Sequence, residues 1–188
     1  METAPKEPKN YSKYSGIYEA VCSGGLGKFV EPTGLELHRL ITGVPTENVK
    51  AFFDSQNPGR NSFPGFACLY CTDKLSLTSA ETPGNLGFHD VPANSHILGF
   101  DFYGNALRID KIDNPIFESG YLNMNSGEKW EFSQGFRFCL EQNNLADGID
   151  AIVWPSVSGK ALRESGHVYG CLPPYSGALK YKGFETLT

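Results

Sequence analysis

Residues 59–81 read GRNSFPGFACLYCTDKLSLTSAE, and this stretch indicates the fold more clearly than any other part of the chain. It begins with Gly, Pro, Asn and Ser, which are typical of loops. An apolar run follows, as in a buried strand, and Thr72 or Asp73 can then cap a short helix. We therefore expect a loop, a strand and a short helix in succession, over 57–65, 66–72 and 75–81.

Further strands are expected on both sides of this stretch. Alternating apolar and polar residues at 35–42 predict a half-buried strand, and the nearly continuous apolar run at 149–155 predicts a strand buried on both faces. Four more strands are expected, over 95–102, 105–112, 167–172 and 178–184. The first two of these would be joined by a tight turn at Tyr103-Gly104.

The clearest helix is expected over 131–146. Its core-facing positions recur at helical spacing and comprise Phe132, Phe136, Cys139, Leu140 and Asn143. Gly148 lies just beyond this segment and suits a C-cap. The chain contains 21 Gly and 12 Pro, so long helices should be few. Together these patterns predict a mixed α+β domain with about six to eight strands.

The composition is that of one globular domain. The 188 residues are 40% hydrophobic and 20% charged, which supplies enough apolar side chain for one core. The net charge of −5 argues against general nucleic-acid binding, because such binding depends on neutralising phosphates. No apolar run approaches the roughly 20 residues that a membrane helix needs, so we expect no membrane partner.

The N-terminal segment differs from the remainder of the chain. Residues 1–16 contain Lys, Glu, Pro, Asn and Ser with almost no aliphatic residues, so we expect a flexible arm there and a single domain over 17–188. The start of the chain lacks the apolar stretch of a secretion signal. We therefore expect a cytoplasmic protein, acting in the producing cell or in a target cell if it is delivered as an effector.

The five cysteines are interpreted as reduced thiols, since a full disulfide framework needs an even number. Cys68 and Cys71 form a CxxC, which raises the possibility of a zinc site. A zinc site would need a second pair at similar spacing, whereas the apolar run around this CxxC favours buried core residues. We expect no metal.

Several polar residues lie on or beside the predicted strands, where burial is costly without partners. The candidates for a functional site are Arg39, Arg60, Tyr70, Glu81 and Ser156. Each alone has a simpler structural interpretation: a surface or ion-paired arginine, a loop residue, a core tyrosine, a helix end or a strand end. His38 and His167 flank strands and could act as bases, although a structural role is the simpler interpretation.

Taken in order, these residues resemble the signature of the RES domain family, which is named for an arginine, a glutamate and a serine. The stretch at 59–81 is similar to the family's Gly-Arg loop, its strand tyrosine and its helix ending in glutamate. Arg39 in HRL matches the family's arginine, Glu81 its glutamate, and Ser156 in GIDAIVWPSV its serine. The resemblance spans about residues 35–175.

The resemblance implies an ADP-ribosyltransferase-like fold of two packed, bent β-sheets with a few short flanking helices and a cleft for NAD+. It implies a toxin that uses NAD+ as its substrate, cleaving the nicotinamide–ribose bond as a glycohydrolase or phosphorylase and depleting cellular NAD+. Many members of the family are held inactive by a partner, so an antitoxin or immunity protein covering the cleft is expected.

The chemistry assigns a role to each candidate. Nicotinamide leaves as a neutral ring, and the ribose passes through a state with oxocarbenium character. Glu81 would stabilise the developing positive charge, with Ser156 holding it or a ribose hydroxyl in place. Arg39, with Arg60, would bind the pyrophosphate, and Tyr70 would stack on nicotinamide.

Two alternative functions stay open. One is a mono-ADP-ribosyltransferase toxin that modifies a macromolecule, although the chain lacks the Glu-x-Glu of the cholera-type enzymes after its second strand. The other is a non-catalytic interaction module, in which the many aromatic residues form core or partner surface. The sequence does not identify whether water, phosphate or a protein accepts the ADP-ribose.

Overall fold

The computed structural model describes residues 7–9, 11–23, 25–49, 68–80, 92–111, 126–156, 165–172 and 177–187. The helical elements are α1 (Tyr11–Ser23), η1 (Leu26–Phe29), α2 (Leu77–Ala80), η4 (Ile109–Lys111) and α3 (Ser126–Gln142). The strands are β1 (Val30–Ile41), β2 (Leu69–Thr72), β3 (Ser95–Arg108), β4 (Ala151–Pro155), β5 (His167–Cys171) and β6 (Leu179–Leu187). The predicted mixed α+β class is confirmed.

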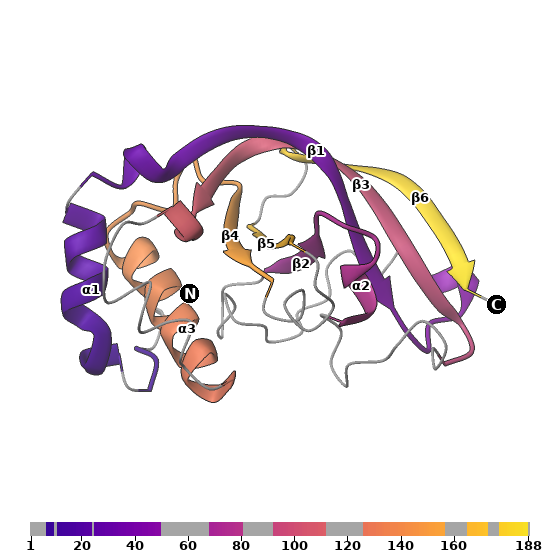
Figure 1. The fold of residues 1–188 in the computed structure, drawn as a ribbon, viewed down its shortest axis with the longest axis horizontal. Coiled ribbons are helices and arrows are strands. Elements are labelled where there is room, and N and C mark those ends of the chain that lie inside the picture. Colours follow the sequence, from indigo (N-terminus) through magenta and orange to yellow (C-terminus); the bar gives the residue numbers. More distant parts are fainter. Residues whose placement is uncertain are drawn as a thin grey trace, which may run out of the picture.

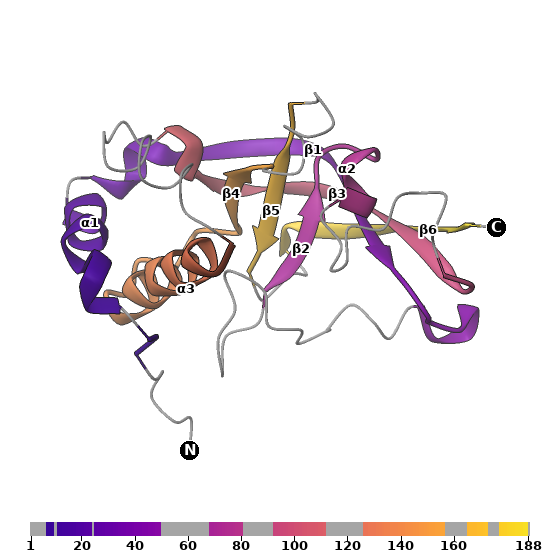
Figure 2. The ribbon, with the colours of Figure 1, turned by 60° about the horizontal axis from the view of Figure 1, so that its bottom comes forward.

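The strands form one sheet in the order β1-β2-β5-β4-β3-β6, and a further pairing of β1 with β3 closes five of them into a barrel. β1 and β3 are antiparallel along their whole shared length, from Val30 opposite Leu107 to Ile41 opposite His96. β6 lies outside the barrel and extends the sheet along β3 (Figure 1). The short strands β2, β5 and β4 lie side by side and form the opposite wall (Figure 2).

This architecture differs from the two packed sheets that we expected. The six described strands are hydrogen-bonded into one continuous sheet, and its bend brings β1 against β3. β4 pairs in parallel with β3 and antiparallel with β5. The hydrogen bonding of the sheet therefore continues without a break from the long strands to the short ones. The likeness to ADP-ribosyltransferases stays a prediction.

The fold contains two apolar cores, one on each face of the barrel wall. Along β4 the side chains alternate, so that Ala151 and Val153 face the barrel interior while Ile152 and Trp154 face the helices. The interior core consists of side chains such as Leu37, Leu69, Cys71, Leu98, Phe100, Phe102, Ala106, Tyr169 and Cys171. The outer core lies between the wall and the helices α1 and α3. The prediction that residues 149–155 are buried on both faces is confirmed.

β3 is one continuous strand, so the predicted turn at Tyr103-Gly104 is wrong. The N–H of Tyr103 donates to the carbonyl of Ala178 at 2.8 Å, and the N–H of Asn105 donates to Oδ2 of Asp150 at 2.7 Å. A Cβ on Gly104 would lie 2.7 Å from that Oδ2 and 2.9 Å from the Cβ of Ala178. The glycine is needed here for close approach of neighbouring chain segments and not for a turn.

α3 confirms the predicted helix, although it starts and ends earlier than expected. Phe132, Phe136, Cys139 and Leu140 are all buried, as their spacing predicts. Asn144, with φ 52°, ends the helix, and the N–H of Leu145 returns to the carbonyl of Leu140 at 2.8 Å. The predicted C-cap at Gly148 is therefore wrong, because Asn also tolerates the left-handed conformation that this type of cap needs.

α1 begins at Tyr11, inside the segment that we expected to be a flexible arm. Tyr14 and Tyr18 are buried, and the Tyr18 ring lies 5.3 Å from the ring of Phe132 on α3. The tyrosines at positions 11, 14 and 18 form one helical stripe. The arm was expected because the segment lacks aliphatic residues, yet these aromatic rings supply the apolar face instead.

Candidate active site

Tyr70 lies on β2, on the face of the wall that packs against the outer core. It is half-buried, and it hydrogen-bonds the thiol of Cys68 two residues earlier. Burial raises the pKa of Cys68 to about 12, while the positive charge of Arg137, the Tyr70 hydrogen bond and the charge of Arg39 oppose that rise. Cys68 and Cys71 are each only 2% exposed, so the interpretation of this CxxC as core is confirmed.

Arg39 lies on β1, on the same strand face as Leu37 and Ile41, which line the barrel interior. Nη1 of its guanidinium is buried, and its charge acts on both Cys68 and Cys171. Arg39 and Tyr70 thus extend from opposite faces of the sheet. Both residues lower the pKa of the same thiol, that of Cys68, which lies immediately before β2.

Arg137 is a second arginine that acts on Cys68, and the sequence analysis did not identify it. It lies on α3 and is 3% exposed. Its Nη2 lies 2.5 Å from Oε1 of Glu141, one turn later on the same helix. The available signal was an arginine inside the apolar run FRFCL with a glutamate four residues on, which is the spacing of a helical ion pair.

Ser156 follows the last residue of β4 and is 6% exposed. Its N–H donates to the carbonyl of Gly166 at 2.8 Å. Tyr70 lies level with Ile152 through Gly170 of β5, so Ser156 lies four residues, roughly 13 Å, further along the strand direction. The structure therefore does not bring Ser156 beside Tyr70.

The ends of β2 and β4 lie at the same edge of the wall, because both strands are antiparallel to β5. After β2, the chain passes through Asp73 into α2, a helix that contacts β1. Glu81 and Arg60, the other two candidates, lie outside the described residues. The predicted short helix at 75–81 is confirmed over the described residues Leu77–Ala80, which form α2.

At this edge His167 is held in one orientation by two charged neighbours. Its Nδ1 lies 2.8 Å from Oδ2 of Asp73, and Nη2 of Arg108 lies 3.3 Å from its Nε2. A carboxylate accepts hydrogen bonds and a guanidinium donates them, so Nδ1 carries the proton and Nε2 accepts. The backbone N–H of His167 also donates to Oδ1 of Asp73, at 2.7 Å.

The same network continues to the surface through Glu31. Its carboxylate lies 3.9 Å from Nη1 of Arg108 and 2.5 Å from Nζ of Lys111. An imidazole oriented by a carboxylate is the arrangement of a general base. Here Nε2, the atom that would take the proton, faces Arg108, so the described geometry supports a structural role for His167.

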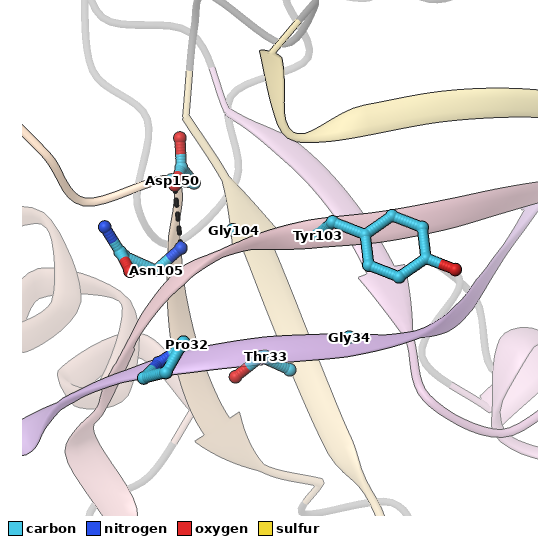
Figure 3. Close-up of a pocket in the computed structure, with 7 residues that line it drawn as sticks. All are labelled: Pro32, Thr33, Gly34, Tyr103, Gly104, Asn105 and Asp150. Atoms are coloured by element: carbon cyan, nitrogen blue, oxygen red, sulfur yellow. Dashed lines mark hydrogen bonds between the residues drawn. The ribbon is translucent and has the colours of Figure 1, made fainter.

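The described part of the surface also carries an open depression, where β1 and β3 run together (Figure 3). It is lined by Pro32, Thr33, Gly34, Tyr103, Gly104, Asn105 and Asp150. The Tyr103 ring extends along the strands away from Asp150. Of the candidates from the sequence that the structure describes, neither Arg39, Tyr70 nor Ser156 lines this depression.

The described residues offer neither a cluster of metal ligands nor a membrane-spanning helix. No three His, Cys, Asp or Glu side chains within those residues gather closely enough to hold a metal ion. None of the helices described is both long and apolar enough to cross a membrane.

The comparison with solved structures shows a similar fold. No protein-family model matches the chain, and no curated protein matches its sequence. A chain of the crystal structure of the M. tuberculosis MbcT–MbcA toxin–antitoxin complex matches with a TM-score of 0.57 at 12% sequence identity. The alignment covers 92% of this chain and 92% of that chain, so the likeness extends over nearly the whole fold.

Proposed function

We propose that this protein is a toxin that cleaves the nicotinamide–ribose bond of NAD+ and so depletes cellular NAD+, as a glycohydrolase or phosphorylase. The observation that carries the proposal is the fold likeness to a chain of a toxin–antitoxin complex over 92% of both chains. The RES-like order of Arg39, Tyr70, Glu81 and Ser156 independently supports the same class.

The geometry limits how the site can be built. Arg39 and Tyr70 extend from opposite faces of the sheet, so a dinucleotide that contacts both would have to pass around an end of β2. A partly buried guanidinium binds phosphate oxygens more strongly than a fully exposed one, because the surrounding apolar groups screen its charge weakly. We assign Arg39 to the pyrophosphate and Tyr70 to the nicotinamide ring, with Arg60 as a second phosphate contact.

Glu81 is assigned the negative charge that stabilises the ribose as nicotinamide leaves. Ser156 is a positioning residue in this proposal, since it lies at the edge of the wall where β2 and β4 both end. A partner antitoxin or immunity protein would cover the proposed NAD+ site and keep the producing cell alive. NAD+ is the substrate, and the proposed chemistry needs no metal.

The test is the NAD+ content of cells after induced expression, compared between the wild type and single variants. We expect Glu81→Gln to lower the rate of NAD+ loss by about 10²–10³-fold, because removing one preorganised charge-stabilising group typically costs that much. Arg39→Ala should also abolish NAD+ loss and growth arrest. Lys180→Ala, at an exposed position of β6, is the matched control and should behave as the wild type.

The purified protein then separates the possible reactions. Incubation with labelled NAD+ and a lysate should yield free ADP-ribose for a glycohydrolase, or its 1-phosphate for a phosphorylase. A labelled macromolecule would instead support ADP-ribosyl transfer. Unchanged NAD+ and harmless expression would support an interaction module. A folded Glu81→Gln variant that consumes NAD+ at the wild-type rate would exclude the assigned role of that residue.

A further inference from the structure

Two cysteines that are distant in the sequence meet where α1 packs on α3. Sγ of Cys22, in the last turn of α1, lies 3.3 Å from Sγ of Cys139 on α3, and 117 positions separate the two residues. Cys139 is 1% exposed, whereas Cys22 is half-buried and gives the pair its access to solvent. A disulfide needs a sulfur separation of about 2.05 Å, so a shift of roughly 1.3 Å would join the two sulfurs.

The groups around the pair favour a thiolate. Hydrogen bonds from Cys22, from the Tyr11 hydroxyl and from the amide of Asn143 lower the pKa of Cys139 to about 7, against the effects of burial and of the Glu19 carboxylate. Nδ2 of Asn143 lies 3.5 Å from the Cys139 sulfur. The hydrogen bond with Cys139 and burial raise the pKa of Cys22. After the first proton leaves, the second is therefore shared between the two sulfurs.

A second thiol pair provides an internal comparison. Cys71 and Cys171 lie on the neighbouring strands β2 and β5, inside the barrel, and are 2% and 1% exposed. Their hydrogen bond and complete burial raise the pKa of Cys171 well above its ordinary value. The thiolate is the reactive form of cysteine, so this pair should be inert.

We propose that Cys22 and Cys139 form a reversible disulfide site, oxidised by hydrogen peroxide, that joins α1 covalently to α3. The Cys139 sulfur, as thiolate, attacks one peroxide oxygen, the O–O bond breaks, and the released hydroxide takes a proton to become water. The Cys22 sulfur then attacks the Cys139 sulfenic acid, and the Cys22 proton leaves with the sulfenic hydroxyl as a second water. Two thiols and one peroxide thus give one disulfide and two waters.

The disulfide would act on the helical layer and not on the barrel. It closes a loop of more than a hundred residues. A cross-link over such a long loop restricts the unfolded chain strongly and so raises the free energy of unfolding. The pair lies beside the contact of Tyr18 with Phe132, so oxidation would fix an interface that already exists. This inference does not depend on the proposed reaction with NAD+.

The test is to treat the full-length protein with stoichiometric hydrogen peroxide, alkylate the remaining thiols, and map the disulfides by mass spectrometry. We expect two of the five thiols to be lost, one cross-linked peptide pair containing Cys22 and Cys139, and full reversal by dithiothreitol. The oxidised protein should melt at a Tm about 5–10 °C higher than the reduced protein.

Two variants keep the result interpretable. Cys22→Ser should abolish both the cross-link and the rise in Tm, whereas Cys71→Ala, in the barrel, should retain both. If Cys71→Ala does not fold, Cys171→Ala serves the same purpose. Loss of no thiols with peroxide, or a cross-link that joins Cys71 to Cys171 in place of the helical pair, would overturn the proposal.

Discussion

At the scale of single residues, close contacts decide the role of the helical glycines. A Cβ on Gly135 of α3 would overlap the Tyr18 hydroxyl oxygen and lie 2.8 Å from both Cε2 and Cζ of that ring. Tyr18 is fully buried, and its hydroxyl donates to the carbonyl of Phe132 at 3.0 Å. Gly135 is therefore present because the ring crosses the helix at that point, and not because the helix bends or ends there.

We predict that Gly135→Ala lowers the free energy of unfolding, although Ala is the better helix former. Moving a buried, hydrogen-bonded ring costs about 1–3 kcal/mol, whereas helix propensity returns about 1 kcal/mol. Gly16→Ala is the matched control, because nothing lies within 4 Å of its added Cβ. That variant should gain stability in denaturant unfolding. Equal stabilisation by both substitutions would contradict the packing of α1 on α3.

At the scale of elements, β3 connects most of the molecule. It pairs with β1 on one side and with β6 and β4 on the other, and its register with β6 shifts between Gly99 and Phe100. A register shift of this kind allows a long strand to bend while it stays paired with its neighbour. One continuous strand therefore serves both the barrel and its outer extension.

The continuity of β3 predicts slow hydrogen exchange where a turn was expected. The amides of Tyr103 and Asn105 donate to Ala178 and Asp150, so both should be protected in exchange followed by NMR. Asp150→Ala should accelerate exchange at Asn105 and leave Tyr103 protected. Rapid exchange of both amides in the wild type would indicate a turn in place of the strand.

At the scale of the whole molecule, the two cores share one wall. Neighbouring residues of β4, such as Val153 and Trp154, belong to different cores. Loss of either core would leave one face of that wall exposed to water, which is costly for a strand that is apolar on both faces. The barrel and the helical layer should therefore unfold together.

We predict that this coupling gives a single unfolding transition. Leu98→Ala in the barrel should cost about 2–5 kcal/mol and Phe136→Ala in the helical layer about 3–5 kcal/mol. Each should shift the midpoints measured by tryptophan fluorescence and by far-ultraviolet circular dichroism equally. Trp154 reports the outer core, so a Leu98→Ala variant that changes only the circular dichroism transition would show that the layers unfold separately.

Local patterns predicted most of the elements. Apolar patterns located β2, α2, β4, β5 and β6 to within three residues and β1 and α3 to within five, because the period of buried side chains is a property of the segment itself. The same reasoning failed at Tyr103-Gly104, where glycine in a strand can signal either a turn or the close approach of another segment. The partners that distinguish the two, Asp150 and Ala178, are more than forty residues away.

For the candidate site too, the sequence predicted residue types, whereas their spatial arrangement came only from the structure. The sequence suggested Arg39, Tyr70 and Ser156 as candidates by residue type and order, and it also predicted that Cys68 and Cys71 are core residues. It did not predict that Arg39 and Tyr70 extend from opposite faces of the sheet, or that Arg137 lies near Cys68. Which strand pairs with which is set by long-range hydrogen bonds, so neighbours across the sheet cannot be read from spacing.

By itself, then, the amino-acid sequence determined the class of the fold, the positions of most strands and helices, and the buried character of Cys68, Cys71 and Cys139. Only the tertiary structure decided that five strands close into a barrel, that α1 covers α3, and that Cys22 meets Cys139. The physical reason is the distance along the chain over which each interaction acts. Periodicity of buried side chains is set within one element, whereas barrel closure and contacts such as Cys22 with Cys139 depend on segments that lie far apart along the chain.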